Sequence, residues 1–298
     1  MNVRDEITIE AHAKVNLTLE ILGIRPDGYH DLRSIVMPVS LSDTITLTRT
    51  PAVFSLTLTT DRGISAVQIG PVEKNLAMRA ARLMKDRYGV RAGVRIHIRK
   101  RIPVGGGMGG GSSDAAGVIR GLNELWGLRR PDEELAALGA ELGSDIPALV
   151  LGGTVLMEGR GERVHRLALD GPVRGFDLVI ANPGIHCSTA EIFSRWKSGL
   201  TTPPKMVQNM AFSIRASDVK RAASLLHNDL EAAAFEGYPA IARLSETLRR
   251  VGCLGVLLSG SGASVFGLVR DRAQGEEICR RLEADGIWNV LAHTCPMV

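Results

Sequence analysis

The sequence has little of the residue types that mark several classes of protein. Four cysteines occur in the 298 residues, with no Cys-x-x-Cys pair and no histidine at metal-ligand spacing, which argues against a disulfide framework or a zinc finger. Aromatic residues make up 4%, too few for a surface that stacks many bases. Basic residues exceed acidic ones by 36 to 32 and form no run longer than three. A nucleic-acid-binding protein, which the net charge of +4 would suit, is therefore the less favoured alternative, and we expect no nucleic-acid partner.

Long apolar runs are also missing. Residues 251–269 carry no charge, but glycines and serines divide them around Ser259–Gly262 into two short runs, which indicates buried strands and not a membrane span. The first six residues lack the apolar segment of a signal peptide. We therefore expect no membrane partner, and the scattered cysteines suit a reducing cytoplasm. The sequence leaves a monomer and a homodimer both open.

The composition and the apolar patterns predict an α+β protein of two domains. Hydrophobic residues at 45% and charged residues at 23% are typical of a globular chain. At this length we expect two domains, residues 1–160 and 161–298. Apolar residues alternate in some segments and recur with helical spacing in others. The expected strands are 7–21, 45–47, 54–58, 94–98, 149–151, 155–157, 177–181, 256–258 and 265–269, and the expected helices are 75–88, 112–125, 188–196, 218–226, 239–250 and 274–285, with one more beginning at 131.

A glycine-rich loop between an expected strand and an expected helix carries the strongest functional signal. Six glycines surround Met108 between Pro103 and Ser112. Glycine lets the backbone approach a ligand closely, and the following helix adds unpaired N–H groups and a partial positive charge. We expect Ser112, Ser113 and Asp114 to cap that helix and the loop to bind the phosphates of a nucleotide.

Two familiar phosphate motifs do not fit this loop. A P-loop requires a lysine where Ser112 follows Gly111. The spacing of Gly105, Gly107 and Gly110 matches the dinucleotide fingerprint, but no acidic residue at a strand end follows about 20 residues later. A flexible connector is the structural alternative, and it is less favoured because linkers rarely join a strand to a capped helix.

Three segments together resemble the GHMP kinase family. They are Ala13–Leu17, the glycine-rich loop and Ser259–Ala263, and they occur in the family's order across most of the chain. The resemblance implies a two-domain α+β fold, with an ATP-binding domain in residues 1–160, a substrate-side domain in residues 161–298 and the active site in the cleft between them. It also implies ATP and Mg²⁺ as cofactors. The ATP-binding residues that it implies are Asn75, Lys100, Pro103, Gly105, Gly106, Gly107, Gly109, Gly110, Gly111, Ser112 and Ser113.

The same resemblance assigns two catalytic residues. Asp145 is expected to accept the proton of a substrate hydroxyl, with Lys14 as its electrostatic partner. From the residues alone, a helix cap is the favoured interpretation of Asp145, and Lys14 reads as a solvated lysine on a strand. If Val15 and Leu17 face the core, however, Lys14 and Asn16 share the opposite face. An ammonium near Asp145 would keep it ionised and neutralise charge on the transferred phosphoryl group.

Further segments resemble one branch of the family. They are Arg25–His30, Gly143–Pro147 and Asn182–Phe193. Members of that branch phosphorylate the 2-hydroxyl of a methylerythritol that carries a cytidine diphosphate group, in non-mevalonate isoprenoid precursor synthesis. A small-molecule kinase of the homoserine or mevalonate type is the alternative. His12 departs from the branch, which commonly has proline before the Ala-Lys pair.

The branch implies a set of substrate contacts. His30 is expected to hydrogen-bond the cytosine, while the rings of Tyr29 and Phe193 stack on the two faces of the base. On their own, Tyr29 and His30 read as an exposed loop and Phe193 as a helix core residue. The substrate-binding residues implied are Asn16, Tyr29, His30, Thr189 and Phe193.

The ligands of Mg²⁺ are not identified by the sequence. Ser112 or Ser113 offers a hydroxyl, and Glu134 has the spacing from Asp145 of a metal carboxylate in other members of the family. Helix capping is an equal alternative to nucleotide binding for Asn75.

Overall fold

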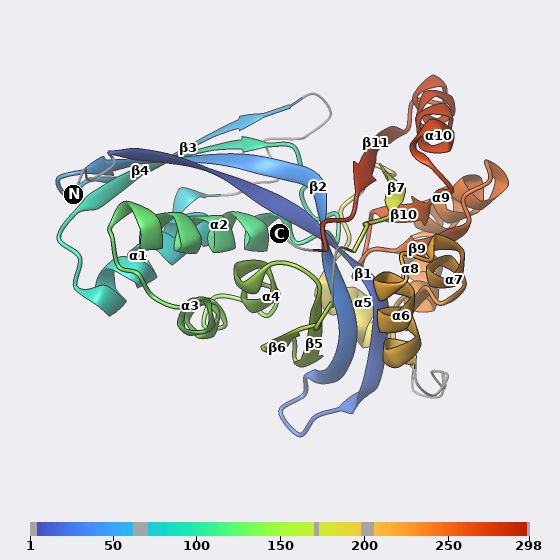
Figure 1. Ribbon diagram of the computed structural model, residues 1–298, viewed down its shortest axis with the longest axis horizontal. Coiled ribbons are helices and arrows are strands. Elements are labelled where there is room, and N and C mark those ends of the chain that lie inside the picture. The colour runs from blue at the N-terminus through green and yellow to red at the C-terminus, as the bar shows by residue number, and fades with distance from the viewer. Residues whose placement is uncertain (1–4, 62–70, 170–172, 198–205, 297–298) are drawn as a thin grey trace. The chain divides into compact units, whose positions relative to one another are not determined.

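The computed structural model describes residues 5–61, 71–169, 173–197 and 206–296 (Figure 1). Contacts divide the chain into two compact units. Unit 1 holds residues 1–13, 42–104 and 109–151, and unit 2 holds residues 14–41, 105–108 and 152–298. Strands β1 (Glu6–Ile24) and β2 (His30–Thr50) contribute residues to both units. A single cut at residue 160 does not reproduce this grouping, because two early segments of the chain belong to unit 2.

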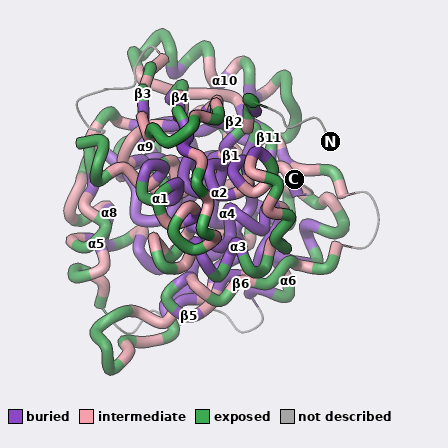
Figure 2. Tube along the Cα trace, turned by 90° about the vertical axis from the view of Figure 1, so that its left-hand side faces the viewer, coloured by how far each residue is buried: buried purple, intermediate pink, exposed green. Residues whose placement is uncertain are grey.

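Unit 1 packs helices against a sheet. Strand β3 (Phe54–Thr60) runs parallel to β4 (Gly93–Lys100), which is antiparallel to the second half of β2. Helix α2 lies close to this sheet, since a Cβ atom on Gly117 or Gly121 would press against side chains of β1 and β2. Figure 2 shows α2 buried along most of its length. The helices of unit 1 are η2 (Val72–Lys74), α1 (Leu76–Tyr88), α2 (Gly110–Leu125), α3 (Asp132–Gly139) and α4 (Ile146–Leu151).

Unit 2 contains a four-stranded antiparallel sheet in the order β11-β7-β10-β9. The first half of β2 pairs with β5, β5 pairs with β6, and β1 pairs in parallel with β8. The elements are β5 (Val155–Gly159), β6 (Arg163–Arg166), β7 (Asp177–Asn182), α5 (Thr189–Arg195), α6 (Met206–Arg215), α7 (Val219–Ser224), β8 (His227–Asn228), α8 (Glu231–Gly237), α9 (Pro239–Arg250), β9 (Gly255–Leu258), β10 (Val265–Leu268), α10 (Arg272–Ala284) and β11 (Trp288–His293).

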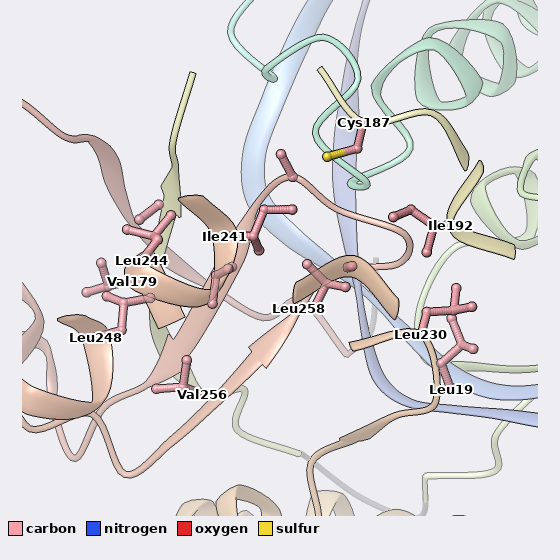
Figure 3. Close-up of a cluster of buried hydrophobic side chains, with 14 of the residues drawn as sticks. Leu19, Val179, Cys187, Ile192, Leu230, Ile241, Leu244, Leu248, Val256 and Leu258 are labelled. Atoms are coloured by element: carbon pink, nitrogen blue, oxygen red, sulfur yellow. The ribbon is translucent and has the colours of Figure 1, made fainter. Parts of the chain in front are cut away.

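The core of unit 2 forms where α9 packs on this sheet. Ile241, Leu244 and Leu248 recur at helical spacing on α9, and Val179 and Val256 lie on the strands (Figure 3). All five side chains are buried. The core thereby fixes the strands β9 and β10 and the turn that joins them.

Two local predictions are wrong. Residues 149–151 are not a strand but the end of helix α4, because a run of three apolar residues does not distinguish a strand from a buried helix. Ser112, Ser113 and Asp114 do not cap α2 but lie inside it, since the helix begins at Gly110 after Gly109 in the left-handed conformation. None of the helices in the described part of the chain has both the length and the apolar character that crossing a membrane requires.

Candidate active site

The three segments that resemble kinase motifs meet in unit 2. The backbone N–H of Lys14 donates to the carbonyl of Met108 at 3.0 Å. The backbone N–H of Ser264 donates to the carbonyl of Gly106 at 3.1 Å, and the hydroxyl of Ser259 donates to that of Gly107 at 3.1 Å. Hydrogen bonds thus join strand β1, the glycine-rich loop and the turn after β9.

The close packing of this junction requires glycine in the loop. Gly105 and Gly107 both have positive φ, at 67° and 72°. A Cβ atom on Gly107 would overlap the carbonyl oxygen of Ser259 and lie 2.7 Å from that of Gly262. A Cβ atom on Gly105 would overlap the imidazole of His186. Side chains have no room at these two positions, because the His186 imidazole fills the space at Gly105 and backbone fills the space at Gly107.

The rest of the loop leads into helix α2 in unit 1. Gly109 is the N-cap residue, with φ 71°, and it has no side chain to bond the first N–H groups of the helix. Those N–H groups belong to Gly110, Gly111 and Ser112, while the hydroxyl of Ser113 donates to the carbonyl of His12 at 2.7 Å. A helix start of this kind attracts anions, because unpaired N–H groups and the helix dipole act together.

Lys14 and Asn16 share one face of β1, as the alternation predicted. Both are buried, and the ammonium of Lys14 donates to Oδ1 of Asn16 at 2.7 Å. A Cβ atom on Gly260 would lie 3.3 Å from that ammonium nitrogen, so the turn after β9 passes directly beside it. The ammonium is held at the junction of the three segments.

Lys100 is part of a buried ion cluster in unit 1. Its ammonium pairs with Asp43 and, at 2.7 Å, with Asp114. Asp43 also accepts the backbone N–H groups of Arg101 and Ile102, at 2.5 and 2.9 Å. Burial raises the pKa of Asp114 despite the attraction of Lys100. Burial alone would lower the pKa of Lys100, but the charges of Asp114 and Asp43 outweigh it, and the pKa is raised.

Other predicted residues of unit 1 have defined places. Asn75 caps α1, since its Oδ1 accepts the backbone N–H of Ala77 at 2.9 Å. Asp145 is half-buried and directly precedes α4. Glu134 is exposed on α3, where its carboxylate accepts the hydroxyl of Tyr88 at 2.9 Å.

An aromatic group surrounds His30 in unit 2. The ring of Phe193 lies 5.0 Å from the imidazole, tilted by 45°, and the ring of Trp196 lies 5.5 Å away in an edge arrangement. Burial lowers the pKa of His30, so the imidazole is neutral near pH 7. Tyr29 is exposed and its ring contacts the guanidinium of Arg160 instead, at 5.0 Å.

Family models match both halves of the chain. The model for the N-terminal domain of GHMP kinases matches residues 75–153, and the model for their C-terminal domain matches residues 210–287. The chain belongs to the GHMP kinase family. Kinases of this family use ATP as the phosphate donor and act on small molecules.

Relatives place the kinase within one branch. It is 41% identical to a 4-diphosphocytidyl-2-C-methyl-D-erythritol kinase of Gloeobacter violaceus, over 94% of this chain and 91% of the relative. It is 40% identical to the enzyme of the same name from Shouchella clausii, over 97% and 96%. A crystal structure of 4-(cytidine 5'-diphospho)-2C-methyl-D-erythritol kinase superposes with a TM-score of 0.80 at 32% identity, covering 96% of this chain and 99% of the other. The kinase is therefore a member of this branch. A homoserine kinase from Cytophaga hutchinsonii, with a TM-score of 0.73 at 17% identity over 99% and 96% of the two chains, shares the fold.

The sequence reasoning did not select Trp196 or His186, which contact two of the predicted site residues of the kinase. Trp196 packs on His30, and its spacing of three residues from Phe193 on an expected helix could have revealed it. His186 lies against Gly105, and no sequence signal links the two residues, because 81 positions separate them. Thr189, in turn, shares a hydrogen bond of 2.9 Å with the hydroxyl of Ser261 in the turn after β9.

Proposed function

We propose that the kinase transfers the γ-phosphoryl group of ATP to the 2-hydroxyl of 4-diphosphocytidyl-2-C-methyl-D-erythritol, a step of non-mevalonate isoprenoid precursor synthesis. The observation that carries the proposal is the junction of the three motif segments around the Lys14 ammonium. The substrate is inferred from the relatives of that name at 32% to 41% identity, whereas the homoserine kinase at 17% supports the fold alone.

The phosphates of ATP are proposed to bind at the glycine-rich loop. The N–H groups of Gly110, Gly111 and Ser112 supply donors, and the residues from Pro103 to Gly109 form the backbone that follows the phosphates. The ammonium of Lys100 pairs with two buried carboxylates, Asp43 and Asp114. We therefore propose that Lys100 supports the start of α2 and does not contact ATP directly. Asn75 lies at the start of α1, where we propose that it borders the nucleoside.

Mg²⁺ is proposed to arrive with ATP. Within the described ranges, no group of three or more His, Cys, Asp or Glu residues is arranged to hold a metal ion. Kinases hold Mg²⁺ mainly through phosphate oxygens and water, with one or two protein groups, so the proposal does not require such a cluster. The hydroxyls of Ser112 and Ser113, in the first turn of α2, are the candidates that we propose, and bound Mg²⁺ would neutralise charge on the phosphates.

Asp145 and Lys14 are proposed to assist the transfer itself. The 2-oxygen of the substrate forms a bond to the γ-phosphorus, the bond from that phosphorus to the β–γ bridging oxygen breaks, and ADP leaves with the electron pair. The hydroxyl proton passes to the Asp145 carboxylate. A carboxylate is a far weaker base than an alkoxide, so Asp145 accepts the proton only as transfer proceeds, and its positioning of the hydroxyl matters as much. The Lys14 ammonium balances charge on the phosphoryl oxygens.

The cytosine is proposed to bind at the aromatic group around His30. A neutral imidazole both donates and accepts hydrogen bonds, which suits a base edge. Phe193 offers a ring face beside His30, and Tyr29 is proposed to leave Arg160 and stack on the other face of the base. Each stacked ring contributes about 1–3 kcal/mol without selecting among bases. Selection of cytosine then depends on His30. Asn16 and Thr189, at the junction of the motif segments, complete the proposed substrate set.

The decisive experiment measures ADP release by the purified protein with Mg²⁺, ATP and each of three alcohols. Turnover with 4-diphosphocytidyl-2-C-methyl-D-erythritol, and not with homoserine or mevalonate, is the expected result. Turnover with one of the other two alcohols alone would retain phosphoryl transfer and overturn the substrate. Replacement of cytosine by uracil in the substrate is expected to raise KM and leave KM for ATP unchanged.

A further inference from the structure

A chain of hydrogen bonds in unit 2 connects the Lys14 ammonium to the backbone. Lys14 donates to Oδ1 of Asn16 at 2.7 Å, and Nδ2 of Asn16 donates to the hydroxyl oxygen of Ser34 at 2.8 Å. The hydroxyl of Ser34 donates in turn to the carbonyl of Thr18 at 2.5 Å. Lys14 is 4% exposed and the other three residues are 0% exposed, so water does not compete for these bonds.

The donors and acceptors along this series of hydrogen bonds follow in one fixed direction. A backbone carbonyl only accepts, so Ser34 must use its single hydrogen on Thr18. The Ser34 hydroxyl oxygen can then only accept a hydrogen bond from Asn16, so the amide must turn its NH₂ group towards Ser34. The amide oxygen consequently faces Lys14, whose ammonium can only donate. Lys14 at one end of these bonds and Ser34 with Thr18 at the other therefore require the same orientation of the Asn16 amide, and Ser34 anchors its NH₂ group.

We propose that Ser34 is a positioning residue for phosphoryl transfer, acting through Asn16 on Lys14. The inference rests on the proposed role of Lys14. Without the Ser34 hydroxyl, the NH₂ group of the buried Asn16 amide loses the acceptor that anchors it, so the amide shifts and the ammonium bonded to its oxygen shifts with it. The ammonium moves from its place beside Gly260, where the turn after β9 approaches it. A displacement of about 1 Å in a catalytic group lowers the rate by as much as about 100-fold.

A series of substitutions at Ser34 separates this role from simple packing. Ser34→Thr keeps the hydroxyl but adds a methyl group to a fully buried site, Ser34→Cys keeps a weak acceptor of similar size, and Ser34→Ala removes the acceptor. If Ser34 positions Asn16, kcat is expected to be highest in Ser34→Thr, lower in Ser34→Cys and lowest in Ser34→Ala. The Ala variant is expected to lie about 10- to 100-fold below wild type, with both KM values changed by no more than about threefold. A packing role predicts the reverse, with the larger Thr side chain the most harmful.

Ser42→Ala is the matched control. Ser42 lies on the same strand, is also buried, and donates its hydroxyl to Glu10 at 2.6 Å, outside the chain that ends at Lys14. It is expected to keep kcat, with thermal unfolding followed for every variant. If Ser34→Ala unfolds, the comparison of Ser34→Thr with Ser34→Cys decides the question alone.

Lys14→Met in the same assay separates the two proposals. Full turnover of Lys14→Met would overturn the role of Lys14 itself. An inactive Lys14→Met together with wild-type kcat in all folded Ser34 variants would overturn only the inference about Ser34. Equal losses in Ser34→Ala and Ser42→Ala would also overturn it, because both would then report the loss of any buried hydroxyl on β2.

Discussion

The Lys100→Met substitution tests the buried ion cluster of unit 1 most directly. Methionine nearly preserves the length of the side chain but removes the ammonium, which leaves Asp43 and Asp114 buried without their counter-ion. The side chains of the cluster are 5%, 0% and 4% exposed, so solvent screens the charges weakly. Breaking a buried ion pair on one side costs about 3–5 kcal/mol.

This loss is large against the stability of a folded protein. In a protein of this size, 1 kcal/mol corresponds to a change in Tm of about 2–4 °C, so Lys100→Met is expected to lower Tm by about 6–20 °C. Lys85→Met is the control, because it removes the same charge from α1, where Lys85 contacts the ring of Phe54. It is expected to cost no more than about 1 kcal/mol. Differential scanning calorimetry of both variants without ligand measures the difference.

Removing all three charges distinguishes a structural role of Lys100 from contact with ATP. The combination of Asp43→Asn, Lys100→Met and Asp114→Asn leaves no unpaired charge in the cluster, so most of the lost stability is expected to return. ATP affinity, measured by calorimetric titration, is then expected to stay within a few-fold of wild type. Recovered stability with a loss of ATP affinity beyond tenfold would refute this reasoning, because the ammonium would then have to meet the nucleotide itself.

Three further predictions follow from the site and its surroundings. Asp145→Asn is expected to lower kcat by about 10²–10⁴-fold while ATP still binds, and near-wild-type turnover would remove Asp145 from its proposed role. Trp196→Ala removes the ring beside His30 and is expected to raise KM for the cytidyl substrate about threefold to tenfold with KM for ATP unchanged, a pattern that equal changes in both constants would contradict. The hydrogen bond between His227 and Asp229 raises the pKa of His227 above the usual histidine value of about 6.5. The pair therefore stabilises the fold fully below pH 6.5, and this stabilisation is lost as the pH rises through the raised pKa. The loss of unfolding free energy in His227→Gln is accordingly expected to be larger at pH 6 than at pH 9, and an equal loss at both would contradict the assignment.

Periodicity predicted most of the regular structure, and it failed where the pattern was short. The alternation from Ile7 to Ile21 and the helical spacing from Leu76 to Tyr88 correspond to β1 and α1. The helices α6 and α8 escaped prediction. The start of α2 was placed two residues late, because serine and aspartate are common caps and glycine is a weaker signal.

The resemblance to the GHMP kinase family identified the segments that form the site, but it did not predict which residues of those segments contact one another. Asp43 and Lys100 are 57 positions apart, and Asn16 and Ser34 are 18 apart. A single sequence carries no signal for such pairs, since each residue reads locally as an ordinary polar residue on a strand. Burial reveals them, because a buried charge or amide requires a partner.

The polar face of β1 shows what burial adds to the interpretation. Alternation predicted a core face containing Val15 and Leu17 and an opposite face containing Lys14 and Asn16, and a half-buried strand would leave the second face in water. Between Ala13 and Ile21 both faces are buried. Apolar residues of similar size would fill the same space without needing partners, and a buried polar network stabilises a protein only when it is fully satisfied. The burial of Lys14 and Asn16 is therefore better explained by the charge that they hold beside Gly260 than by the stability of the strand.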